Sequence, residues 1–128
     1  MEQLDPRAEQ KLSGPAWEKV RLQIETIHNA LTAVSPTARG ELMAIYIKYV
    51  SEETKGQPFA VLWIKTSKQL VLGLALPEPF DSGELEQAPE RHTYAGVTGY
   101  LTLKPGELVP SDVPRWARMA YENVKANA

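Results

Sequence analysis

Residues 59–76, FAVLWIKTSKQLVLGLAL, decide the fold because they read as two strands joined by a tight turn. Residues 59–66 and 70–76 are apolar runs of strand length, and the three residues 67–69 between them suit a hairpin. In the second run, leucines alternate with smaller side chains. This pattern predicts a leucine face and an opposite face that carries Val71, Gly73 and Ala75.

Two further strands are predicted on either side of this hairpin. Residues 42–50 alternate in polarity before it, and residues 97–104 do so after it. Between the third and fourth strands, residues 77–90 hold three prolines and five acidic side chains, which is typical of a long loop. Short connections favour antiparallel pairing of consecutive strands.

A helix is predicted at each end of the strand region. In the first helix, which begins near Pro15 and ends before Pro36, apolar residues recur every three or four positions. The second begins at Ser111 or Asp112, with Pro114 in its first turn. The sequence therefore predicts an α+β two-layer sandwich of order α-β-β-β-β-α, a mainly antiparallel four-stranded sheet with both helices on one face. Residues 1–12 are expected to be a flexible N-terminal segment, and residues 13–128 a single domain.

Composition excludes several kinds of chemistry. The 128 residues include no cysteine, so disulfides, thiolate nucleophiles and cysteine-ligated zinc are ruled out. The formal net charge of −2 argues against a wholly basic nucleic-acid coat. Apolar stretches fall short of the ~20 residues that a membrane helix needs. We expect a cytoplasmic protein with no membrane partner.

Three segments resemble a small bacterial family known only as a domain of unknown function, some of whose members are labelled "predicted transport protein". They are YIKYVSEETKGQPFAVLWIKTSKQLVLGLALPE, RHTYAGVTGYLTL and LVPSDVPRWARMAYENV. The resemblance covers roughly residues 30–125. It implies an α+β domain of this order, but no activity and no catalytic residues. The residues that carry it are Tyr46, Tyr49, Phe59, Ala60, Lys65, Lys68, the run 70–76, His92, Gly96, Ala120 and Tyr121.

The sheet face away from the helices is the main candidate for a binding surface. It is predicted to combine aromatic, small and basic side chains, on which the rings of a ligand could stack while lysines meet its phosphates or carboxylates. The side of the sheet on which Trp63 lies is left open by the pattern, and tyrosine and threonine also favour strands for reasons unrelated to function. The candidate ligand-binding residues are Tyr46, Lys48, Trp63, Tyr100, Lys104 and His92.

His92 also suggests an enzyme, with a carboxylate of the acidic loop as its partner. A loop histidine that bonds to backbone explains the same residue without catalysis. His28, beside the apolar stripe of the first helix, is expected on the flank of that helix. The two histidines match no metal-ligand spacing, and we expect no metal and no cofactor.

Three functional hypotheses follow. The first is a non-catalytic binding module for a nucleic acid, a peptide or a small anionic ligand. The second is an interaction or scaffold protein, such as a homodimer, that self-associates through the same face or a strand edge. The third, and weakest, is an enzyme that uses His92.

Overall fold

The computed structural model describes residue 4, residues 6–77, residue 85, residue 94 and residues 96–128. In this part of the chain, five strands form one antiparallel sheet in the order β1-β2-β3-β4-β5, so each strand lies beside its sequence neighbour. The predicted α+β class is confirmed, with five strands where four were expected. The elements are α1 (Pro6–Lys11), the 3₁₀ helix η1 (Pro15–Trp17), α2 (Glu18–Thr32), β1 (Arg39–Leu42), β2 (Tyr46–Val50), β3 (Ala60–Thr66), β4 (Gln69–Leu74), β5 (Gly99–Leu103) and α3 (Val113–Ala126).

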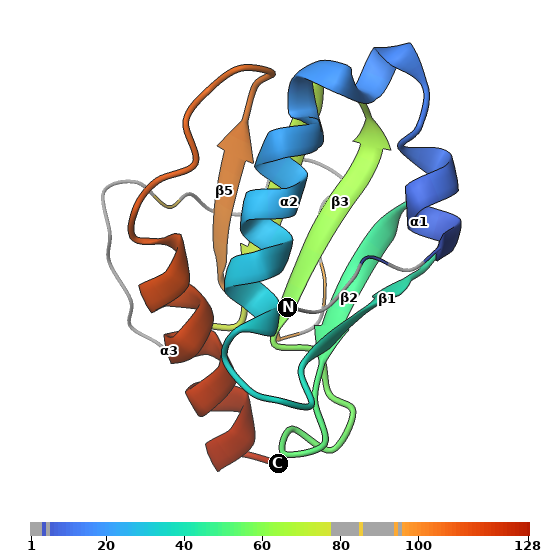
Figure 1. Ribbon diagram of the computed structural model, residues 1–128. Coiled ribbons are helices and arrows are strands. Elements are labelled where there is room, and N and C mark those ends of the chain that lie inside the picture. Colours follow the sequence, from blue (N-terminus) through green and yellow to red (C-terminus); the bar gives the residue numbers. More distant parts are fainter. Residues whose placement is uncertain (1–3, 5, 78–84, 86–93, 95) are drawn as a thin grey trace.

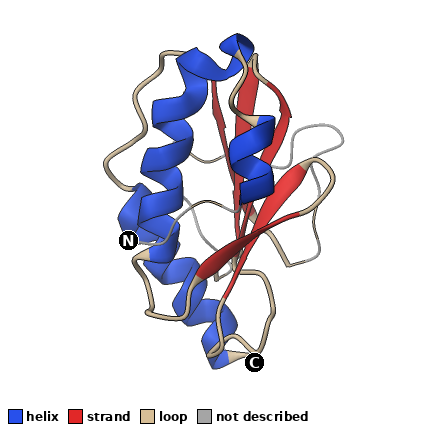
Figure 2. Cartoon of the chain, turned by 45° about the vertical axis from the view of Figure 1, so that its right-hand side comes forward, coloured by secondary structure: helices blue, strands red, loops and turns tan. Residues whose placement is uncertain are grey.

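All three α-helices lie on one side of the sheet, which we call the helix face (Figures 1 and 2). The leucines of β4 point to this face, as predicted. They share one buried core with the apolar stripe of α2 and with Trp116 of α3. Burial of each large apolar side chain contributes about 1.5–3 kcal/mol, so this core is what holds the helices to the sheet. The described part of the chain holds no helix with both the length and the apolarity to span a membrane.

The predicted strand over residues 42–50 is wrong in its extent. It is a hairpin, in which Met43 N–H donates to the Tyr46 carbonyl at 2.7 Å and the chain reverses at Ala44 and Ile45. The preceding residues form β1, which pairs with β2 from Arg39↔Val50 to Leu42↔Ile47. Sequence patterning missed this turn because it contains no glycine, proline, asparagine or aspartate, the residues that usually mark one.

Gly40 allows β1 to pair closely with β2. A Cβ atom at this position would sit 2.8 Å from Ile47 Cγ2 and 3.0 Å from the Tyr49 ring. A side chain here would therefore collide with the large residues of the helix face. The glycine lets the edge strand pair closely with its neighbour.

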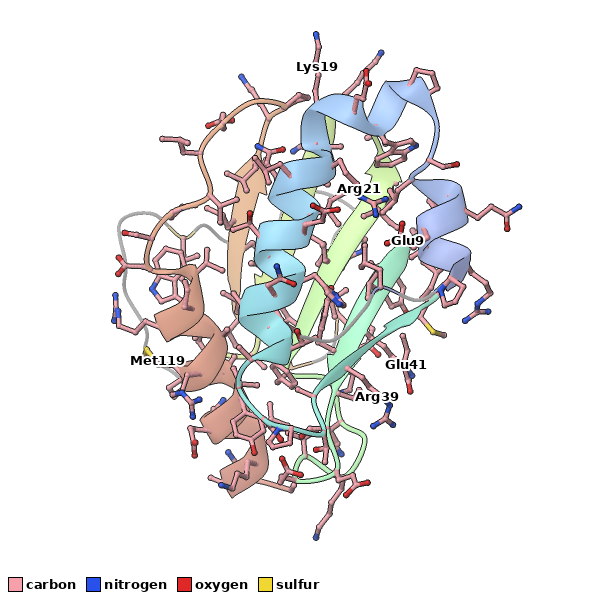
Figure 3. The ribbon with its side chains drawn as sticks, in the orientation of Figure 1. Glu9, Lys19, Arg21, Arg39, Glu41 and Met119 are labelled. Carbon is pink, nitrogen blue, oxygen red and sulfur yellow. The ribbon has the colours of Figure 1, made fainter. Side chains whose placement is uncertain are left out.

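Part of the N-terminal segment that was expected to be flexible, residues 1–12, forms a helix. Residues 6–11 form α1, and Leu4, Ala8 and Leu12 are buried in the core. Ala8 lies within α1, and Leu4 and Leu12 lie on either side of it along the chain. Arg21 of α2 also forms ion pairs with Glu9 at 2.5 Å and with Glu25 at 3.0 Å. Figure 3 shows Glu9 and Arg21 side by side between the two helices.

Candidate functional site

The face of the sheet away from the helices, which we call the second face, carries a row of aromatic rings. The Trp63 ring, whose side was left open, lies here, between Tyr46 at 6.2 Å and Tyr100 at 6.0 Å. Tyr94 continues the row, 5.7 Å from Tyr46 in an edge-on arrangement. The structure thus brings together three of the aromatic residues that the sequence analysis grouped.

The expectation that this face is open is wrong for its centre. Trp63 and Tyr100 are each only 3% exposed, and they form a small buried cluster against which Tyr94 and Val97 pack. Burial raises the pKa of the Tyr100 hydroxyl, and a hydrogen bond from the Tyr94 backbone partly opposes this rise. Rings that are covered in this way cannot stack on the rings of a ligand.

The room expected above Gly73 is also filled. A Cβ atom at Gly73 would lie 2.7 Å from Val97 Cγ1, 3.0 Å from Trp63 and 3.2 Å from Tyr100. The glycine therefore accommodates the protein's own side chains, and this point offers no space to a ligand.

The two candidate lysines lie toward opposite edges of the sheet. Lys48 is half-buried on β2, and its Nζ is 3.6 Å from the Glu41 carboxylate of β1. Lys104 is exposed just beyond the end of β5, where its backbone N–H donates to the Glu107 carboxylate at 2.7 Å. They therefore do not act together on one ligand-sized patch.

His92 lies outside the described residues, so the structure does not address the enzyme hypothesis. Among the residues that are described, no group of three or more histidine, aspartate and glutamate side chains is placed to hold a metal ion.

His28 was expected on the flank of its helix, but the structure buries it. Its Nδ1 is 2.8 Å from the hydroxyl of Tyr49, which is fully buried. Burial raises the pKa of Tyr49, so this hydroxyl keeps its proton. The pair joins α2 to β2 and is part of the structural core.

A second polar cluster that the sequence did not indicate is centred on Glu53. Its Oε1 accepts hydrogen bonds from the Ser35 hydroxyl and from the Tyr121 hydroxyl at 2.8 Å, and its Oε2 accepts one from Thr37 at 2.7 Å. The hydroxyl of Ser35, followed by those of Thr37 and Tyr121, lowers the pKa of Glu53 to about 2. Because these residues come from the α2–β1 segment, the β2–β3 segment and α3, the carboxylate ties three parts of the fold together.

The feature most suggestive of a contact surface is the turn of the β1–β2 hairpin. Met43 is 40% exposed, Ile45 is 39% exposed and Ala44 between them is also exposed. The strands beside this turn present polar and aromatic side chains on the second face. We call the whole set the hairpin surface, which consists of Arg39, Glu41, Met43, Ala44, Ile45, Tyr46 and Lys48.

Charges on the hairpin surface centre on one carboxylate. Glu41 lies 3.1 Å from the guanidinium of Arg39 and 3.6 Å from Lys48 Nζ. Arg39 and Glu41 lie side by side on β1 in Figure 3. Only Tyr46 and Lys48 of this surface belonged to the predicted site. Residues 42–47 contain no turn-forming residue, so no local signal could have located the rest.

Comparison of the chain with protein-family models, with curated proteins and with solved structures found no match. The resemblance noted in the sequence analysis therefore stays a prediction.

Proposed function

We propose that this protein is a non-catalytic binding module that contacts a protein or peptide partner through the hairpin surface. The observation that carries the proposal is the exposure of Met43, Ala44 and Ile45 in consecutive positions of a hairpin turn. Hairpin turns are ordinarily built from glycine, asparagine and aspartate. Apolar residues that are exposed together, next to polar ones, are typical of protein interaction sites.

Other exposed apolar side chains support this choice by contrast. In the described part of the chain, the remaining large ones are Leu22 on α2 and Leu108 in the segment before α3. Each comes from a different element than the hairpin, and single exposed leucines are common on protein surfaces.

The geometry favours a protein partner over a nucleic acid. Stacking of bases needs accessible rings, and Trp63 and Tyr100 are covered. Lys48 already lies beside Glu41, so the hairpin surface presents both signs of charge. We also propose that the protein is cytoplasmic, as we expected from the sequence.

Photo-crosslinking tests the proposal in the cell. The probe is p-benzoylphenylalanine in place of Ile45, and the matched control carries it in place of Leu108, which is 91% exposed. We expect a discrete protein adduct from position 45 that disappears in the Met43→Glu background. Adducts of equal yield from both positions, or none from position 45, would contradict a contact at the hairpin.

A further inference from the structure

We propose that the partner at the hairpin surface is a second copy of this chain, paired along β1 so that Arg39 of each copy faces Glu41 of the other. The inference rests on the proposed function, because it names the occupant of that same surface.

The two edges of the sheet differ in their access to solvent. At the β5 edge, Tyr100, Leu101 and Leu103 are all buried. At the β1 edge, all four residues are exposed or half-buried. Because a solvent-exposed edge strand is a template for pairing with another chain, β1 is the edge at which a second copy can add.

The hydrogen-bond pattern shows which backbone groups of β1 are available. Since Met43 pairs with Tyr46, the alternation of an antiparallel ladder directs the backbone groups of Arg39 and Glu41 toward β2. Those of Gly40 and Leu42 point away from the sheet. The Leu42 carbonyl accepts a hydrogen bond from the Arg7 guanidinium at 3.3 Å, whereas no hydrogen bond from the described residues reaches the outward groups of Gly40.

Only one two-fold register of β1 against a second β1 fits these outward backbone groups. A pairing centred on Glu41 would set two carboxylates opposite each other, and one centred on Leu42 would need the carbonyl that Arg7 already occupies. A pairing centred on Gly40 joins its N–H and C=O to those of the partner's Gly40. It also sets Arg39 opposite the partner's Glu41 twice, by symmetry.

The side chains permit this exchange at small cost. The Arg39–Glu41 pair within one chain is exposed, and exposed ion pairs contribute little to stability, so either residue can turn to the other copy. Opposite charges directly across an antiparallel pair are favourable, and like charges are not. The exposed turn at Met43 extends beyond the paired residues and adds apolar contact at both ends.

Sedimentation equilibrium with charge-reversed variants tests the inference. For the wild type, we expect the weight-average mass to rise from one chain toward two as the concentration is raised into the millimolar range. Arg39→Glu alone and Glu41→Arg alone should each remain monomeric, because each sets like charges across the two-fold axis. An equimolar mixture of the two variants should recover the association, because each mixed pair is again complementary. Arg115→Glu, which alters an exposed ion pair on α3, should associate as the wild type does.

A measurement on the wild type guards against variants that fail to fold. In ¹H–¹⁵N spectra, the Gly40 amide signal should shift with protein concentration, while that of Gly14, which lies before η1, should not. A protein that is monomeric at every concentration, or an Arg39→Glu variant that associates as well as the wild type, would overturn the inference. In the first case, a hetero-adduct from position 45 in the crosslinking experiment would still leave the proposed function standing.

Discussion

Gly73 lies under three packed side chains of the second face, and Glu53 lies at the junction of three segments. Neither residue looks unusual in the sequence, because a glycine in a strand and a glutamate in a polar loop are both common. Their contacts in the folded chain make them important for stability. Three side chains fill the space above Gly73, and three hydroxyls donate to Glu53. Single substitutions at these positions test the structure directly.

Gly73→Ala is expected to lower the free energy of unfolding by about 1–3 kcal/mol, the usual cost of inserting a group into a packed site. The added methyl would need Val97 and Trp63 to move, since both lie within 3.0 Å of its position. Urea denaturation followed by tryptophan fluorescence measures the change. Gly14→Ala is the control, because nothing lies within 4 Å of its Cβ position, and it should stay within about 0.5 kcal/mol of the wild type. Equal stability of the two variants would contradict the packing described here.

The Glu53 carboxylate is expected to stabilise the fold in a pH-dependent way. Its pKa is lowered from 4.5 to about 2, so the folded state favours the charged form. This stabilisation is fully present above the unfolded pKa and is lost as the pH falls through the folded pKa. The stability difference between the wild type and Glu53→Gln should therefore be largest near neutral pH and shrink from pH 4.5 toward pH 2.

Urea denaturation at several pH values follows this difference. Glu122→Gln is the control, because Glu122 is an exposed residue 3.7 Å from Arg118 on the same helix, and such pairs contribute little. A Glu53→Gln difference that does not change with pH would show that the three hydroxyls do not favour the charged carboxylate.

At the scale of the element, α1 is the clearest case of a helix that tertiary contacts create. Its six residues are too few for a helix to be stable alone in water. The buried residue of α1, Ala8, and Leu12 directly after the helix are part of the helix-face core. The ion pair from Glu9 to Arg21 lies at the surface, where solvent weakens it.

The apolar contacts are therefore expected to dominate the docking of α1. Leu12→Ala should lower the free energy of unfolding by about 2 kcal/mol or more, as for other buried leucines. Glu9→Gln should change it by less than about 1 kcal/mol. Limited proteolysis near Lys11, combined with urea denaturation, distinguishes the two variants. If Glu9→Gln freed the segment as readily as Leu12→Ala did, the ion pair would be the main attachment.

At the scale of the whole molecule, the sheet is buried on both faces at its centre. The helices cover one face, and the aromatic cluster of Trp63 and Tyr100 is packed on the other. The recognition surface that we propose therefore lies at the hairpin, at one edge of the sheet. This arrangement makes the fold less suited to base stacking than its strand composition suggests.

A labelled single-stranded oligonucleotide is accordingly expected to show no saturable rise in anisotropy, even at low salt. The rings that would stack on bases are covered, and Lys48 and Lys104 lie far apart in the sheet order. A saturable rise that weakens with salt and is lost in Tyr46→Ala would instead support nucleic-acid binding at the second face.

The sequence by itself determined the helix-face core. The three-to-four-residue spacing of Val20, Ile24, Ile27 and Leu31 and the alternation in β4 are local patterns, and the structure buries these side chains as predicted. The start of α3, with Pro114 in its first turn, was likewise evident from local signals. Such features are readable because the period of an element fixes which residues share a face.

Only the tertiary structure decided the hairpin at Ala44, the docking of α1 and the covering of the second face. Residues 61–64 did indicate that the second face is covered, since a strand that is apolar on both faces is typical of one buried on both sides. The hairpin turn lacks the usual turn residues, and α1 depends on its contacts with the helix-face core. Tyr94 and Val97 reach Trp63 from a distant part of the chain. The docking of α1 and the covering of the second face depend on contacts between separate elements, and a local pattern holds no information about which elements will meet.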